Sequence, residues 1–213
     1  CYSQINAENE AFDFEADEIH MHLLDEGMML TDGKLIPGML KNIVQVRLRL
    51  GKVQWVAEFL ESWGPRISDD PAGAAIRYHR ALLAFEQGQF SRCLRDMEVV
   101  MRDFKADLHY GVDARAIALM CVYEINKTED WSQEFDARLN AFRLYLIRDE
   151  KMGERRKLRH LNLIKQFRKL MSLSNEAPSQ QGAKAAKMLE GLKNLKPASN
   201  RKWFERQVSD FLG

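Results

Sequence analysis

Apolar residues at helical spacing, interrupted by glycine, constrain the fold of this chain more than any other feature. Between residues 36 and 50 one stripe of a helix is formed by Leu40, Ile43, Val44 and Leu48. Gly51 follows this stripe, and glycine readily takes the left-handed conformation that ends a helix. Sustained alternation with a period of two, bounded by hairpin turns, is absent. The sequence therefore predicts an all-α fold with almost no strand.

The same reasoning places helices along the whole chain. Turn residues separate them at Thr31-Asp32-Gly33, Gly64-Pro65 and Gly88. Asp70-Pro71 has the chemistry of a helix N-cap followed by proline at the first helical position. The stretch Asn175 to Gln181, which contains Pro178, is the best loop or linker candidate. The predicted helices cover residues 8–30, 36–50, 52–63, 72–87, 91–104, 110–126, 131–148, 154–173, 182–195 and 199–212.

These helices pair as antiparallel hairpins, and their spacing suggests a repeat. Gly51 and Gly88 are 37 residues apart, and each lies between two predicted helices. The stretch Ala81 to Leu94, with small residues on both sides of Gly88-Gln89-Phe90, resembles a tetratricopeptide repeat. Residues 44–60 look like a degenerate second copy, and the resemblance covers about residues 34–148. Three positions depart from the pattern of the family: Arg77, Ala84 and Lys105.

The resemblance implies antiparallel helical hairpins stacked as a short α-solenoid. We expect an acidic N-terminal helix in residues 1–33, tetratricopeptide-like hairpins in residues 34–173, and a linker with capping helices in residues 174–213. Trp203 and Phe204 are expected to shield the apolar end of the last helical pair, because a solenoid must cover its terminal repeat. The C-terminal part is also similar to the ends of bacterial tetratricopeptide-like proteins.

Charge is distributed unevenly along the chain. Residues 1–150 carry 17 Lys and Arg against 26 Asp and Glu, whereas residues 151–213 carry 15 against 5. Residues 1–33 contain nine acidic residues and no Lys or Arg. This polarity can steer a partner protein or a nucleic acid. It is equally compatible with solvated helix faces, or with an acidic N-terminal face that lies near the basic end of a neighbouring molecule.

No pattern in the sequence indicates catalysis. His20 and His22 are two positions apart, so they point in different directions on a helix and cannot chelate one ion. A phosphate-binding glycine loop and a nucleophile elbow are both absent from the sequence. Cys93 and Cys121 lie in apolar helical patterns and are expected to be buried small hydrophobic residues. We therefore predict no catalytic, cofactor-binding or metal-binding residue, and a protein that is not an enzyme.

The predicted function is a scaffold or adaptor that binds a peptide or partner protein on the concave face of its helical hairpins. The tetratricopeptide resemblance implies that Lys41, Gln45, Arg49 and Tyr78 hold acidic groups there. Ordinary solvent-facing roles for these residues remain open. The alternative is a regulatory module that binds nucleic acid through residues 151–206, with Arg155, Arg156 and Arg159 on the basic surface. The partner and the oligomeric state do not follow from the sequence.

Cysteine content and hydropathy bear on the compartment. The three cysteines are too few and too scattered for a disulfide framework, which favours a reducing compartment such as the cytoplasm. The longest apolar run, Ala116 to Tyr123, is too short to cross a bilayer. Because the chain begins with Cys1 rather than Met, we expect a portion upstream of it. A lipoprotein anchored through Cys1 is the alternative.

Overall fold

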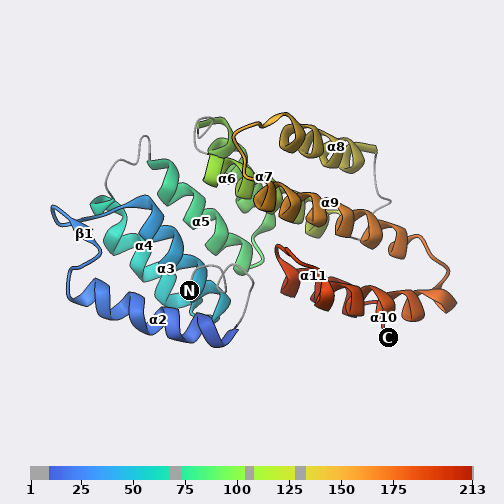
Figure 1. Ribbon diagram of the computed structural model, residues 1–213, viewed down its shortest axis with the longest axis horizontal. Coiled ribbons are helices and arrows are strands. Elements are labelled where there is room, and N and C mark those ends of the chain that lie inside the picture. The colour runs from blue at the N-terminus through green and yellow to red at the C-terminus, as the bar shows by residue number, and fades with distance from the viewer. Residues whose placement is uncertain (1–9, 68–72, 104–107, 128–132, 213) are drawn as a thin grey trace. The chain divides into compact units, whose positions relative to one another are not determined.

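The computed structural model describes residues 10–67, 73–103, 108–127 and 133–212. Within these ranges the chain forms ten α-helices, one short 3-10 helix and one sheet of two short strands (Figure 1). The predicted all-α class is therefore confirmed. The chain divides into two compact units, Cys1–Thr128 (unit 1) and Glu129–Gly213 (unit 2), so the boundary differs from those expected after residues 33 and 173.

The described part of unit 1 contains six α-helices and the small sheet. Its helix α2 packs against α3, α3 packs against α4 and α5, and α6 packs against both α5 and α7. The elements are α2 (Glu10–Asp25), β1 (Leu30–Thr31), β2 (Lys34–Leu35), α3 (Pro37–Arg49), α4 (Val53–Trp63), the 3-10 helix η1 (Gly64–Arg66), α5 (Ala74–Glu86), α6 (Phe90–Asp103) and α7 (Leu108–Ile125).

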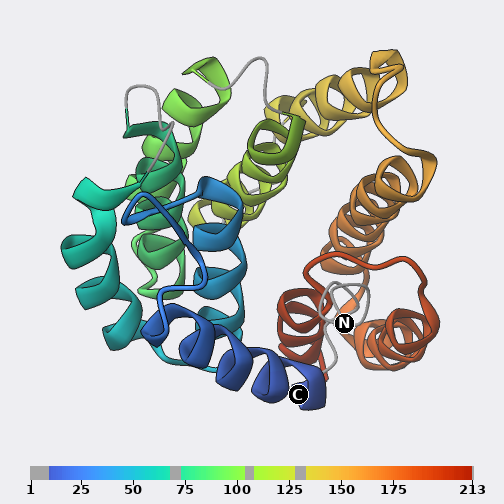
Figure 2. The same cartoon turned by 60° about the vertical axis from the view of Figure 1, so that its left-hand side comes forward.

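The described part of unit 2 consists of four helices, and α9 contacts each of the other three (Figure 2). They are α8 (Gln133–Arg148), α9 (Glu154–Ser174), α10 (Pro178–Asn194) and α11 (Arg201–Ser209). Aromatic rings form the centre of this unit: Phe167 of α9 lies 5.4 Å from Phe135 and 5.0 Å from Phe204, measured between ring centroids. Trp203, 5.5 Å from Phe167, is also buried. Both C-terminal aromatic residues thus belong to the core of unit 2.

The predicted glycine stops are confirmed. Gly51 and Gly88 both have φ of +72°, in the left-handed region. After α3, the Gly51 N–H donates to the Leu48 carbonyl and the Lys52 N–H donates to the Arg47 carbonyl. This pair of bonds is the Schellman motif, which satisfies carbonyls that the end of a helix leaves unpaired. Each glycine therefore lets the chain reverse into the next helix.

A third glycine ends the first helix earlier than predicted. Gly27 has φ of +70°, and the Met28 N–H donates to the Leu23 carbonyl, so α2 stops at Asp25 instead of continuing to residue 30. The predicted turn at Asp32-Gly33 instead joins β1 to β2. Both of its residues have positive φ, as the two-residue turn of a hairpin requires.

Two further expectations need correction. Pro178 is the first residue of α10, so the predicted linker is shorter than residues 175–181. Proline at the first position of a helix costs no hydrogen bond, because the N–H that it lacks would have no partner within the helix. The predicted third hairpin is not a unit of the fold, because α7 packs within unit 1 and α8 packs on α9 within unit 2. The predicted N-cap at Asp70-Pro71 lies outside the described residues.

Candidate interaction surface

Two buried carboxylates attach the acidic helix α2 to the rest of unit 1. Asp13, whose side chain is 1% exposed, lies 2.6 Å from the guanidinium of Arg49. Asp17 lies 2.5 Å from Arg47 and also pairs with Lys52. Arg47 in turn stacks 3.9 Å from the ring centroid of Trp55, a cation–π contact. The acidic residues on the inner side of α2 are thus neutralised by the basic C-terminal end of α3.

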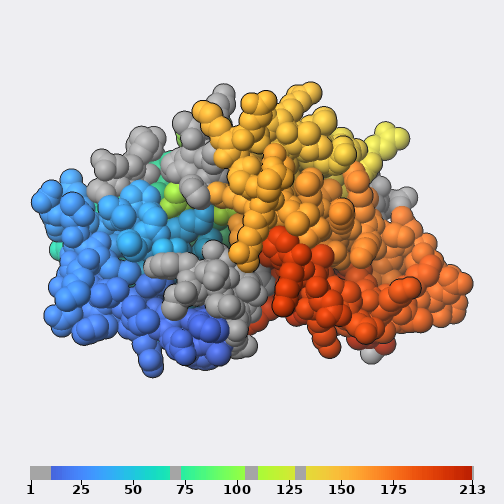
Figure 3. Space-filling model, viewed as in Figure 1, coloured from blue at the N-terminus to red at the C-terminus, as the bar shows by residue number. Residues whose placement is uncertain are grey.

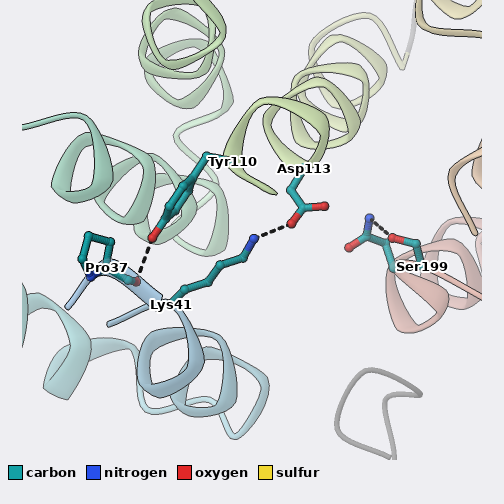
Figure 4. Close-up of polar contacts among 6 residues, drawn as sticks. Pro37, Lys41, Tyr110, Asp113 and Ser199 are labelled. Carbon is teal, nitrogen blue, oxygen red and sulfur yellow. Dashed lines mark hydrogen bonds and ion pairs between the residues drawn. The ribbon is translucent and has the colours of Figure 1, made fainter. Parts of the chain in front are cut away.

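Lys41 makes a second polar contact inside unit 1. Its Nζ lies 2.6 Å from Oδ2 of Asp113 on α7, as Figure 4 shows. The same ammonium lies 5.0 Å from the ring centroid of Tyr110 and 5.7 Å from that of Tyr78. Tyr110 donates its hydroxyl hydrogen to the Pro37 carbonyl at 2.8 Å. These contacts connect the first turns of α3 to α5 and α7.

The solvent-facing alternative for Lys41 and Arg49 is therefore wrong. Their side chains are 15% and 21% exposed, and each holds a carboxylate of its own unit. Tyr78 is 1% exposed, and its hydroxyl contacts the half-buried side chain of Gln45. The periodicity of α3 does not reveal these roles, because the carboxylates that hold Arg49 and Lys41 come from α2 and α7. All four predicted residues have intramolecular roles.

His79 is the most unusual titratable group in the interior of unit 1. It is fully buried, and neither ring nitrogen has a hydrogen-bond partner among the described residues. Its ring makes edge contacts with Tyr78 and Tyr110 at centroid distances of 5.1 and 5.9 Å. Burial, with a smaller contribution from the charge of Lys41, lowers the pKa of His79 to about 3. The imidazole is therefore neutral at physiological pH.

The two described thiols have the properties of core residues. Cys93 and Cys121 are both 0% exposed. A hydrogen bond with Cys121 and then burial raise the pKa of the Cys93 thiol far above its ordinary value. Because the thiolate is the nucleophilic form, this environment suppresses reactivity. No group of three or more His, Cys, Asp or Glu side chains that could hold a metal ion occurs within the described part of the chain.

Unit 2 exposes apolar and basic side chains at the end of α8 and at the start of α9. Leu144, Ile147 and Leu158 are 44%, 47% and 43% exposed. We call the surface around them the α8–α9 face; it consists of Arg143, Leu144, Ile147, Arg148, Arg155 and Leu158. None of its three arginines forms an ion pair with any residue that the structure describes.

The local fold explains why these residues are exposed. The buried stripe of α8, which includes Phe135 and Phe142, packs on α9 through Phe167 and His160. Leu144 and Ile147 are off this stripe, so they point outward from the last two turns of α8. A connection of five residues, 149–153, leads from α8 to α9. Within it, Asp149 Oδ1 accepts hydrogen bonds from the Lys151 and Met152 N–H groups. This turn brings the first turns of α9 back beside the end of α8.

The α8–α9 face includes only part of the predicted basic surface. Arg155 is exposed, whereas Arg156 and Arg159 are half-buried and the Nε of each is buried. Further along α9, Arg168 donates a hydrogen bond to Asn140 of α8 at 2.7 Å. Figure 3 draws α8 and α9 in yellow to orange as a continuous outer surface. The sequence signal that points to this face is Leu144 and Ile147, two apolar residues that the core stripe of α8 does not use.

Comparison with known proteins identifies no relative: no protein-family model, curated protein or solved structure matches this chain. Among the described residues, no helix combines the length and the hydropathy that a membrane span requires.

Proposed function

We propose that this chain is a non-catalytic helical module that binds another protein through the α8–α9 face. The proposal rests on three exposed aliphatic side chains, at the end of α8 and the start of α9, and on three arginines of the same segments that form no ion pair among the described residues. Contiguous exposed apolar residues rimmed by charge are typical of interaction sites. Arginine is also enriched at protein interfaces, because its planar group binds carboxylates in fixed geometry and stacks well.

The partner that fits this surface best is an acidic amphipathic helix. The apolar residues Leu144, Ile147 and Leu158 offer contact area for a helix that presents apolar side chains at i, i+3, i+4 and i+7. Arg143, Arg148 and Arg155 are placed to meet acidic side chains at its edges. Nucleic acid is favoured less, because exposed leucine and isoleucine side chains gain nothing from a phosphate backbone.

The architecture of unit 1 supports a scaffolding role within this proposal. The pairs α3 with α4 and α5 with α6 are consecutive packed helices separated by glycine turns, which is the arrangement expected of a short tetratricopeptide-like solenoid. We propose that unit 1 is a short tetratricopeptide-like solenoid of the kind that helical-repeat adaptor proteins use. Because Lys41 and Arg49 hold carboxylates of their own unit, the partner site is assigned to the α8–α9 face instead.

Binding of a designed peptide tests the proposal. The probe is a fluorescent amphipathic helical peptide built from leucine and glutamate, and anisotropy measures its affinity for the full chain. We expect Arg148→Gln combined with Arg155→Gln to weaken binding about fivefold or more. Leu144→Ser combined with Ile147→Ser should weaken it as well. The matched control is Lys187→Gln combined with Lys193→Gln on α10, which removes two exposed charges outside the face.

Two outcomes would overturn the proposal. The first is equal peptide affinity for all three variants and the original chain. The second is preferential binding of a single-stranded oligonucleotide that the arginine variant weakens and the Leu144/Ile147 variant does not, which would assign the face to nucleic acid. Circular dichroism of every variant confirms that a loss of binding is not a loss of fold.

A further inference from the structure

The outer side of α2 is a second exposed surface, and its chemistry is opposite to that of the α8–α9 face. Phe14 and Ile19 are 56% and 49% exposed, and Glu15 and Glu18 lie exposed beside them. We call Phe14, Glu15, Glu18 and Ile19 the α2 face. The opposite side of the helix is buried and contains Asp13, Ala16, Asp17 and His20. The helix is thus attached to unit 1 by one side and presents the other to solvent.

The acidic charge of the α2 face is not used elsewhere in the described structure. Asp13 and Asp17 hold basic residues of α3 and the turn after it, but Glu15 and Glu18 make no ion pair within the ranges that are described. The neighbouring sequence offers no compensation, since residues 1–33 contain no Lys or Arg. The face therefore combines two large apolar side chains with unneutralised carboxylates.

We propose that the α2 face of one copy of this chain docks on the α8–α9 face of a second copy. This inference rests on the proposed function and names the partner of that site. Each face is apolar enough to lose water on contact: Phe14 and Ile19 on one side meet Leu144 and Ile147, which are neighbours at i and i+3 of α8, on the other. Glu15 and Glu18 supply the negative charge that Arg143, Arg148 and Arg155 lack in their own molecule.

Contact between two different faces of identical chains has a consequence for the assembly. Each copy keeps one free face after it binds, so the association is head-to-tail and grows into a ring or an open chain. Exposed ion pairs contribute little individually and are screened by salt. We therefore expect weak association that increases with protein concentration and decreases with salt.

Complementary charge reversal tests the docking directly. Sedimentation equilibrium of the full chain measures the average mass over a wide concentration range at low and high salt. Glu15→Lys combined with Glu18→Lys gives an acid-reversed variant, and Arg148→Glu combined with Arg155→Glu gives a base-reversed variant. Each alone should remain monomeric, because its two faces now have the same sign. An equimolar mixture should regain the mass of the assembly, because the changed faces are complementary between the two variants.

A matched control separates a specific contact from a general effect of charge. Lys187→Glu combined with Lys193→Glu changes net charge as the base-reversed variant does, but on α10, and it should assemble as the original chain does. The base-reversed variant should keep its helix content, because Arg155→Glu is favourable in the first turn of α9, Arg148→Glu is unfavourable in the last turn of α8, and each effect is small.

Three results would overturn the inference: an original chain that stays monomeric at every concentration, an assembly that both variants leave intact, or a mixture that fails to assemble. If the leucine and glutamate peptide binds a chain that stays monomeric, the α8–α9 face has a different partner, and the self-association alone is wrong. If the peptide also fails to bind, the proposed function is wrong as well.

Discussion

The two units carry opposite net charge and use it differently. Unit 1 has 14 Lys and Arg against 20 Asp and Glu, whereas unit 2 has 18 against 11. In unit 1 the charges next to the core are paired: Asp13 with Arg49, Asp17 with Arg47, and Lys41 with Asp113. In unit 2 the core is aromatic, and arginines of the α8–α9 face remain exposed.

Charge density in a sequence therefore does not indicate whether a charge stabilises the fold or remains available to a partner. A buried ion pair fixes how two helices pack, because removing one partner leaves an uncompensated charge in the interior. An exposed charge contributes little to folding and remains available to a partner. Substitutions in unit 1 should therefore change stability, whereas charge substitutions on the α8–α9 face should change binding.

The largest effect on stability is expected at Asp17. Replacing Asp17 with Asn removes the partner of both Arg47 and Lys52 from a site that is 5% exposed. We predict a loss of about 3–5 kcal/mol in the free energy of unfolding, measured by urea titration followed by circular dichroism. In unit 2, Glu190→Gln on the exposed side of α10 should change stability by less than about 0.5 kcal/mol. If both variants lost a similar amount of unfolding free energy, charge would not be more important for folding in unit 1 than in unit 2.

A second prediction concerns the pH dependence of unit 1. The pKa of His79 is about 3 in the folded protein and near 6.5 once the chain unfolds, so the unfolded state takes up the proton first. Stability from this residue is complete above pH 6.5 and is lost as pH falls toward 3. Between these two pH values, protonation of His79 in the unfolded state lowers the free energy of unfolding by about 1.4 kcal/mol per pH unit.

The variant His79→Met removes this proton uptake. The two ring nitrogens of His79 have no hydrogen bond to lose, so an apolar side chain of similar volume should cost little at pH 7. Between pH 6 and pH 4 the original chain should lose about 2–3 kcal/mol more than the variant does. Urea titrations of both proteins across this range check the difference, and parallel pH profiles would show that His79 is protonated or hydrogen-bonded in the folded state.

Smaller changes in stability, of opposite sign, are expected when two glycines are replaced by alanine. Gly88 has φ of +72°, and a Cβ there would meet open space, so Gly88→Ala costs only backbone strain, about 1 kcal/mol. Gly191 lies within α10 of unit 2, also with open space around it, and Gly191→Ala should stabilise by about 0.5–1 kcal/mol. Midpoints of thermal unfolding should move in opposite directions. A shift of the same sign in both would contradict the assigned backbone conformations.

Helix positions could be predicted from the sequence because they depend on local patterns. Apolar spacing located nearly every helix, and the positive φ at Gly51 and Gly88 followed from their place between two helices. Gly27 was missed as a stop because apolar residues continue beyond it through Met28 and Leu30. The helix was therefore extended five residues too far.

The site could not be predicted in the same way, because it depends on which helices meet. Lys41 contacts Asp113, which is 72 residues away in the sequence, and Arg49 contacts Asp13, which is 36 residues away. Nothing in the sequence near either basic residue indicates these partners. The sequence predicts that both basic residues hold acidic groups of a partner, because neither lies on the apolar stripe of α3. For Leu144 and Ile147 the signal was present, since a helix with apolar residues outside its core stripe exposes them.

The most direct test compares the two regions in one measurement, the affinity of the leucine and glutamate peptide for two matched double variants. Lys41→Gln with Arg49→Gln removes two basic charges from unit 1, and Arg148→Gln with Arg155→Gln removes two from unit 2. At a temperature where circular dichroism shows both proteins folded, we predict that the unit 1 variant binds the peptide as the original chain does and the unit 2 variant binds about fivefold more weakly or worse. The reverse order of affinities would contradict the central claim that basic charge is structural in unit 1 and recognises a partner in unit 2.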